Sequence, residues 1–142
     1  MAVDQDKVYF YAETDKALSP HTGENWMYLL IDADQDPTTG WYGYDYLINK
    51  KVVDEKTTTL MGYDPNNPGN PWVEKAKLNY KYNGNALEVA IPRNLLGLKG
   101  NAFTFDFKWS DNPADLKDPI SLCVNGDAAP NRRFNYRCIW GK

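Results

Sequence analysis

The most informative stretch of the sequence runs from residue 75 to residue 91 and reads KAKLNYKYNGNALEVAI. Residues 75–82 and 86–91 predict two β-strands on either side of the pair Asn83-Gly84. An Asn-Gly pair favours the type I′ turn, whose backbone twist matches that of the flanking strands. We therefore expect a tight antiparallel hairpin at this point of the chain.

Strand-like segments occur on both sides of this hairpin. Further strands are predicted at residues 7–13, 26–32, 44–50, 57–63, 102–109 and 133–140. Residues 26–32 are apolar on both faces, so we expect a central strand that is covered on both sides. The only helical signal lies near residues 92–97, where Pro92 suits the first helical position and Gly97 the exit. We therefore predict an all-β antiparallel β-sandwich of about eight strands with one short helix.

The length and composition suit one domain. A chain of 142 residues can bury roughly 68–70% of its unfolded surface, and we place a single domain at residues 7–142 behind a flexible lead of residues 1–6. The net charge of −3 and the scattered Lys and Arg do not suggest a nucleic-acid binder. No run of 18 apolar residues is present, so we expect no membrane span. The polar start contains no signal peptide, which suggests a part of a longer chain.

Residues 32–46 read DADQDPTTGWYGYDY and predict a loop between two strands. Calcium takes six to eight oxygen ligands from carboxylates, carbonyls and water, and alternating acids can converge where the chain curls. The EF-hand spacing is absent, because this loop lacks Gly at the sixth position and Glu at the twelfth. We predict a structural Ca²⁺ site formed by Asp32, Asp34, Asp36 and Asp45. The alternative is that the aspartates only cap backbone N–H groups of the turn.

Aromatic residues make up 14% of the sequence, which is typical of a β-rich protein or of a stacking surface. Sugars expose flat C–H faces that pack on aromatic rings, and binding residues concentrate on loops. The rings that end the 32–46 loop look exposed, and two exposed rings would mark a sugar site. The predicted ligand-binding residues are Trp41, Trp72, Tyr63, Trp109 and Arg137. The alternative for Trp41 and Trp72 is a lid packed over the end of the sandwich, and Trp109 also continues an apolar stripe.

The two cysteines, Cys123 and Cys138, are 15 positions apart. They form no CxxC motif, and a single His is too few for a Cys/His zinc site. One alternative is a disulfide, which would stabilise the fold by about 3 kcal/mol on the chain-entropy model. The other is two buried free thiols, since Cys is among the most buried residue types.

Little in the sequence indicates catalysis. A Ser–His–Asp triad would depend on His21, which lies in a predicted loop, and neither a GxSxG motif nor a Gly-rich phosphate loop is present. Paired carboxylates for glycoside hydrolysis need only be close in space, but nothing singles out an acid in an apolar pocket. We therefore predict that this chain is not itself an enzyme.

Four segments taken together resemble one known group. They are NWMYLLIDADQDPTTGWYGYDYLIN (25–49), LEVAIPRNLLGL (87–98), FDFKWSDN (105–112) and NGDAAPNRRFNYR (125–137). In this order they resemble the carbohydrate-binding domain-like group related to family-nine carbohydrate-binding modules, within the DOMON-like β-sandwiches. The resemblance spans nearly the whole chain, and its motifs are specific in combination and weak singly.

The resemblance implies a β-sandwich that binds sugar, with calcium in some members. We therefore expect a non-catalytic carbohydrate-binding module of a secreted glycoside-hydrolase-type system, which binds a polysaccharide or oligosaccharide in a secreted, periplasmic or cell-surface bacterial protein. One alternative is a spacer that packs against a catalytic domain through aromatic anchors. Another follows from DOMON-like relatives that bind haem, for which His21, Met27 and Met61 are candidates. A joint departure from the family pattern at Cys123 and Cys138 favours the disulfide.

Overall fold

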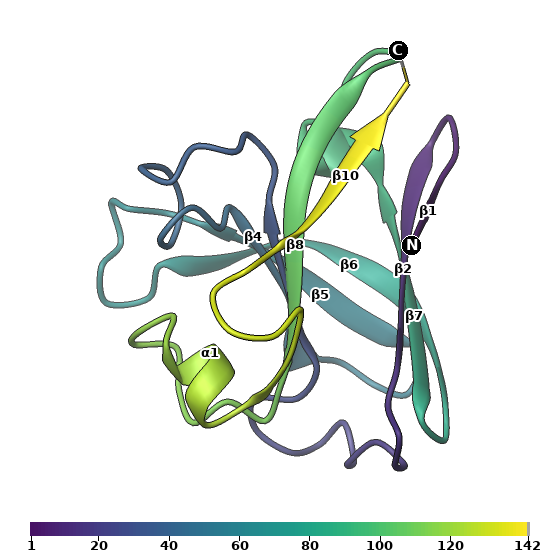
Figure 1. Ribbon diagram of the computed structural model, residues 1–142, viewed down its shortest axis with the longest axis vertical. Coiled ribbons are helices and arrows are strands. Elements are labelled where there is room, and N and C mark those ends of the chain that lie inside the picture. The colour runs from purple at the N-terminus through teal and green to yellow at the C-terminus, as the bar shows by residue number, and fades with distance from the viewer. Residues whose placement is uncertain (142) are drawn as a thin grey trace.

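The computed structural model describes residues 1–141. Its elements are the strands β1 (Ala2–Val3), β2 (Lys7–Glu13), β3 (Tyr28–Asp32), β4 (Tyr46–Val52), β5 (Thr57–Tyr63), β6 (Trp72–Asn83), β7 (Ala86–Pro92), β8 (Phe103–Asp111), β9 (Asp127–Ala129) and β10 (Tyr136–Trp140), and the short helices η1 (Arg93–Leu96) and α1 (Ser121–Val124). All strand pairs are antiparallel (Figure 1). The predicted all-β antiparallel fold is therefore confirmed, with ten strands in place of the eight predicted.

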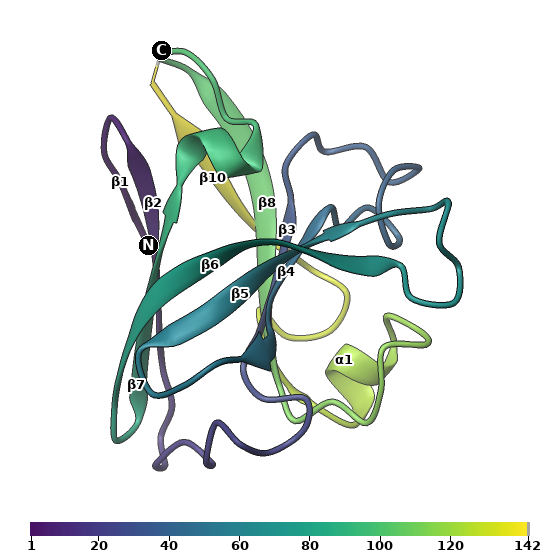
Figure 2. The same cartoon turned by 180° about the vertical axis from the view of Figure 1, so that it is seen from behind.

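One continuous sheet runs in the order β1-β2-β7-β6-β5-β4-β3-β8-β10, with β9 beside β8. The long strand β6 belongs to both halves of the sheet, because its first part pairs with β5 and its last residues pair with β7. The sheet therefore folds over at β6 into two layers (Figures 1 and 2). We call β1, β2 and β7 the first layer, and β5, β4, β3, β8, β9 and β10 the second layer.

The predicted hairpin is present as β6 and β7, but its turn lies one residue later than expected. Asn83 pairs with Ala86, so the two turn residues are Gly84 and Asn85. Gly84 has a φ of +59°, whereas the φ of Asn85 is not positive. A positive φ at the first turn residue alone is the type II′ pattern, not the type I′ pattern. The glycine therefore occupies the first turn position, which we had assigned to Asn83.

The main core fills the space between the two layers. It contains Val8, Phe10, Leu87, Val89 and Ile91 from the first layer, and Leu29, Ile31, Ile48, Leu60, Phe105 and Phe107 from the second. The ring of Phe10 on β2 lies edge-on to those of Phe105 and Phe107 on β8, at centroid distances of 6.0 and 5.2 Å. In residues 1–141 these two strands are not neighbours in the sheet. Side-chain packing therefore closes the sandwich along this junction.

A second apolar cluster covers the outer face of the second layer. Tyr28 and Leu30 of β3 belong to it, whereas Leu29 and Ile31 belong to the main core, because side chains alternate along a strand. The other members are Trp41, Tyr44, Leu47, Met61, Trp72 and Leu122. Every residue of β3 is buried. The prediction of a central strand covered on both sides is therefore confirmed.

Several predicted boundaries move where the backbone adopts a positive φ. β3 begins at Tyr28, not at residue 26, because Met27 has a φ of +43° and cannot continue a strand. The last strand begins at Tyr136, not at residue 133, and Arg132 before it has a φ of +61°. Residues 110–131, whose turn-forming residues predict a loop, contain α1 and β9.

Lys108 on β8 holds the segment between β9 and β10. Its side chain is 1% exposed, and its Nζ donates hydrogen bonds to the carbonyl oxygens of Pro130, Arg132 and Phe134 at 2.6, 2.8 and 2.9 Å. Burial lowers the pKa of Lys108, because the charged ammonium loses water. The three carbonyl groups replace that water, since an ammonium has three protons to donate.

Residues 1–6, predicted as a flexible lead, contain β1, which pairs with β2. The Asp4 carboxylate accepts hydrogen bonds from the backbone N–H groups of Asp6 and Lys7 and from the Tyr9 hydroxyl. The segment expected to be a flexible lead is therefore paired with the sheet. Among residues 1–141, no helix has the length and apolar character needed to cross a membrane.

Candidate functional site

The loop at residues 32–46 connects β3 to β4 and is built from aspartate turns. Its first three aspartates each accept a hydrogen bond from a backbone N–H two or three residues later, at 2.6 Å for Asp32, 2.9 Å for Asp34 and 2.8 Å for Asp36. The Asp36 carboxylate also accepts a hydrogen bond from the Thr38 hydroxyl at 2.6 Å. Such turns follow from the short reach of the Asp side chain. The capping hydrogen bonds expected for Asp32 and Asp36 are therefore present.

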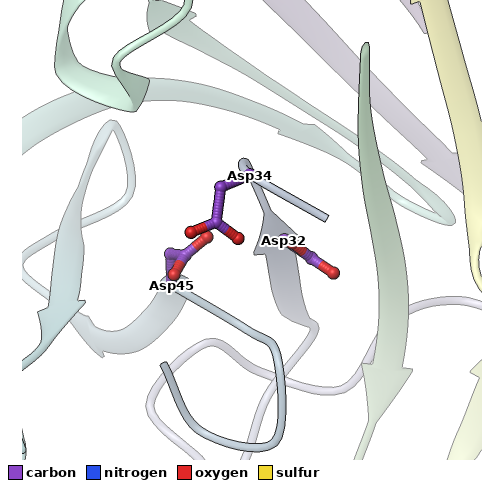
Figure 3. Close-up of side chains that lie close together, drawn as sticks. All are labelled: Asp32, Asp34 and Asp45. Atoms are coloured by element: carbon purple, nitrogen blue, oxygen red, sulfur yellow. The ribbon is translucent and has the colours of Figure 1, made fainter. Parts of the chain in front are cut away.

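Three carboxylates also lie close together where this loop meets the strands. Oxygens of Asp32, Asp34 and Asp45 lie within 4.8 Å of one another, and we call these residues the acidic group. Figure 3 shows the Asp34 and Asp45 carboxylates facing each other, with that of Asp32 directed to the other side. The Thr39 hydroxyl lies 3.0 Å from Asp34 and 3.5 Å from Asp45. Asp36, predicted as a further ligand, lies outside this group.

The acidic group disfavours its own ionisation. Burial raises the pKa of Asp32 to about 6, and the negative charges of Asp45, Asp34 and Asp106 contribute to the rise. The pKa of Asp45 is also raised, mainly by burial. A hard cation bound at about 2.3–2.6 Å from each oxygen would span the separation of these oxygens and relieve their repulsion. The chemistry of these donors therefore fits a divalent ion such as Ca²⁺.

The tryptophans expected to stack on a ligand are buried. Trp41 is 7% exposed and Trp72 is 5% exposed, and their ring centroids lie 6.4 Å apart with the planes inclined by 64°. Tyr63 packs edge-on against Trp72 at 5.3 Å. The prediction that these rings are exposed is wrong. They are packed, as in the lid alternative, but they cover the outer face of the second layer and not the end of the sandwich.

A tight turn directs Trp41 inward. The backbones of Trp41 and Tyr44 exchange two hydrogen bonds, of 2.8 and 3.0 Å. Gly40 has a φ of +60°, and a Cβ at that position would collide with the Tyr44 carbonyl. The chain can therefore double back there only because residue 40 is glycine. The turn places Trp41 in the cluster on the outer face of the second layer.

Trp109 on β8 is the predicted ligand residue that faces a groove. This groove has a volume of about 510 Å³ and follows the junction between β2 and the strands β8 and β9. Phe107 also lines it, together with Tyr11 and Tyr136, which are 49% and 45% exposed. The rings of Tyr136 and Phe107 lie 5.3 Å apart. We call this feature the tyrosine groove.

The remaining predicted ligand residues lie elsewhere. Arg137 follows Tyr136 on β10 and therefore points to the other face of the strand. Its guanidinium donates two hydrogen bonds to the Asp106 carboxylate, at 2.8 and 2.9 Å. Tyr63 lines a shallow pocket of about 390 Å³ beside the acidic group. The structure therefore does not gather the predicted ligand residues into one site, and only Trp109 among them lines the tyrosine groove.

Sequence reasoning did not identify Tyr11 and Tyr136 as site residues. The alternation of β2 assigns Tyr11 to the face opposite Phe10, and that alone indicates an exposed ring. What the sequence does not show is that β2 and β8 meet across the sandwich. Tyr11 and Tyr136 line the same groove only because of that long-range contact.

Cys123 and Cys138 are free thiols. Cys138 is buried in the main core, whereas Cys123 packs beside the outer cluster, with its Sγ against the Arg132 carbonyl. The two clusters lie on opposite faces of the second layer, so the disulfide alternative does not hold. The buried-thiol alternative is confirmed for Cys138.

The residues considered as haem ligands pack into the protein. Met27 belongs to the main core and Met61 to the outer cluster. The ring of His21 lies edge-on to that of Trp26 at 6.2 Å. Because the two methionines lie in different clusters, they cannot act together as axial ligands of one iron.

Comparison with known proteins identifies no relative. No protein-family model matches the chain, and it matches neither a curated protein nor a solved structure. The function must therefore be argued from the residues and their arrangement.

Proposed function

We propose that this chain is a non-catalytic carbohydrate-binding module of a secreted bacterial polysaccharide-processing system, and that sugar binds in the tyrosine groove. The observation that carries the proposal is the pair of half-exposed rings, Tyr11 and Tyr136, beside Trp109 in one groove. The groove volume of about 510 Å³ lies within the range of small-molecule sites. The resemblance to carbohydrate-binding modules supports the same function.

The groove offers both kinds of contact that a sugar needs. The tyrosine rings offer apolar faces to the C–H groups of a pyranose, and their hydroxyls supply a polar end. Carboxylates accept hydrogen bonds from sugar hydroxyls, and Glu13 and Asp111 line the same groove. The Tyr11 hydroxyl donates a hydrogen bond to Glu13 at 2.7 Å, which fixes the position of that ring.

A Ca²⁺ ion held by the acidic group belongs to the same proposal. Asp34 and Asp45 would supply facing carboxylates, with one oxygen of Asp32 within 4.8 Å of theirs and the Thr39 hydroxyl beside them. The ion would stabilise the 32–46 loop and thereby the lid of Trp41, without contacting the sugar. Calorimetric titration of chelator-treated protein tests this part, with Asp45→Asn as the variant. We expect Ca²⁺ to release heat and raise the melting temperature only in the unsubstituted protein; no response in either would reject a Ca²⁺ site.

Affinity electrophoresis in gels that contain plant or host polysaccharides tests the sugar site. Tyr11→Ala and Tyr136→Ala should each weaken retention about three- to tenfold, the loss expected for one stacking ring, whereas the corresponding Phe variants keep the ring and should bind. Tyr42, which is 64% exposed and does not line the groove, provides the alanine control. Absence of retention on every polysaccharide, or equal retention after both alanine substitutions, would reject the proposal.

A second candidate function is a spacer that packs against a catalytic domain of a longer chain. It is favoured by large apolar side chains exposed near α1 and β10: Val124, Phe134 and Ile139 are 70%, 68% and 74% exposed. Aromatic side chains such as that of Phe134 are enriched in the buried cores of protein interfaces. Failure of the folded domain to bind any polysaccharide would favour this function over the first.

A further inference from the structure

The charge of the tyrosine groove is one-sided. Four carboxylate residues line it: Glu13, Asp15, Asp111 and Asp127. Within residues 1–141 its lining contains no lysine or arginine side chain, and the only basic group on it is the α-amino group of Met1. None of the four carboxylates takes part in the ion pairs of the described chain, which are Lys51–Glu74 and Arg137–Asp106.

Two of these carboxylates face each other across the sheet. Asp111 on β8 and Asp127 on β9 are direct partners in the strand register. Like charges directly opposite each other destabilise a sheet. Burial is the main cause of the raised pKa of Asp111, and the charge of Asp127 adds a smaller contribution. The backbone N–H of Met27 donates to Asp111 at 2.9 Å, so Asp111 is held in place despite this repulsion. A ligand that brought a positive charge to this pair would relieve the repulsion.

The aromatic lining favours the same ligand charge. The face of a tyrosine ring attracts a cation electrostatically, and the effect grows as water is removed. Tyr11 and Tyr136 offer half-exposed rings beside the carboxylates. An ammonium group in the groove could therefore contact a ring face and a carboxylate at once.

We infer that the tyrosine groove selects a sugar that carries free ammonium groups, such as a β-1,4-linked glucosamine oligomer. This inference rests on the proposed carbohydrate-binding function and specifies its ligand class. The sugar ring would stack on a tyrosine, and its ammonium would lie against Asp111 and Asp127. Acidic polysaccharides would be repelled by the four negative side chains of the groove. Neutral glucans would gain nothing from these charges, so charge complementarity favours a cationic sugar over both.

Calorimetric titration with two matched oligosaccharides tests the inference. One is a glucosamine oligomer with free amines, and the other is the N-acetylated oligomer of the same length and linkage, which has no charge. We expect the free-amine oligomer to bind about tenfold more tightly, as one charge-assisted hydrogen bond would produce, and to lose most of this advantage at high salt. Equal or weaker binding of the free-amine oligomer would overturn the inference while leaving the proposed sugar binding intact.

Substitutions of single carboxylates test whether the preference for the free-amine oligomer arises in the tyrosine groove. Asp127→Asn removes one exposed carboxylate and should reduce the preference for the free-amine oligomer about threefold to tenfold, while leaving binding of the N-acetylated oligomer unchanged. Glu74→Gln on β6 removes the same charge outside the groove and should leave the preference unchanged. An equal loss in the Glu74 variant would overturn the inference, since it would indicate attraction by net charge alone. Binding of a lysine-rich peptide with no binding of either oligomer would overturn both the inference and the proposed function.

Discussion

Replacement of Lys108 by methionine tests how the segment that precedes β10 is held. The substitution keeps the length of the side chain and removes the ammonium that donates to the carbonyl oxygens of Pro130, Arg132 and Phe134. This tether lies between β9 and Tyr136, both of which line the tyrosine groove. We therefore expect Lys108→Met to lower the free energy of unfolding and to loosen the segment.

The three hydrogen bonds of Lys108 set the size of the expected loss in the free energy of unfolding. A hydrogen bond to a charged group contributes about 1.5–3 kcal/mol, so three of them give an upper limit of about 5–9 kcal/mol. Two effects reduce it. Methionine avoids the desolvation that lowers the pKa of Lys108, and residues 131–134 are exposed, so their carbonyl groups can regain water. We expect a net loss of about 2–4 kcal/mol, or roughly 6–15 °C in melting temperature.

Two measurements separate global from local effects. Urea unfolding followed by tryptophan fluorescence gives the loss of stability, and limited trypsin digestion reports the segment itself, because Arg132 and Arg133 are exposed cleavage points. Lys77→Met changes an exposed lysine on β6 and should alter stability by less than about 0.5 kcal/mol. If Lys108→Met behaved like this control in both measurements, the tether would contribute nothing and the reasoning would be refuted.

Three further outcomes are expected. Trp72→Ala should lower the free energy of unfolding by about 3–5 kcal/mol in urea titrations, because the ring is buried against Trp41; a loss below about 1 kcal/mol would show that the lid is not packed. Thiol titration of denatured, unreduced protein should detect both Cys123 and Cys138, and a reductant should leave the melting temperature unchanged. Burial raises the pKa of Asp111, so the folded state binds its proton more tightly than the unfolded state does. The contribution of Asp111 to stability should therefore be complete below the unfolded pKa and decline as pH rises through the folded pKa. Asp111→Asn should flatten this part of the pH dependence of the urea midpoint.

The fold could be predicted largely from local sequence. Alternation and turn residues located β2, β5, β7 and β8 to within about two residues, because each depends on its own side-chain pattern. The errors lie where the backbone leaves the regular regions, as at Met27, and where a strand is short and held by distant residues, as at β9. The predicted position of the hairpin turn was one residue too early, because Asn83-Gly84 and Gly84-Asn85 are both acceptable turn pairs.

The candidate site was less predictable, because it depends on contacts between distant segments. The aspartates of the 32–46 loop could be selected by type and spacing, and the inclusion of Asp45 in the acidic group agrees with the prediction. Trp41 and Trp72 were misjudged because loop residues are usually exposed, whereas here the loops cover the apolar outer face of the second layer. Nothing local to Tyr28 or Leu30 indicates that their face would be covered by residues 41–44.

The topology explains why we propose the tyrosine groove, and not the loops, as the sugar site. The two layers are continuous at β6, but at the opposite side β2 and β8 meet only through side chains such as Phe10 and Phe107. A hollow forms where these contacts end and the strands continue. Its rings project from paired strands, and Tyr136 packs directly on Phe107 in the core. A ligand there meets rings that are already held in position, so binding orders few side chains and costs less conformational entropy than ordering a free loop would.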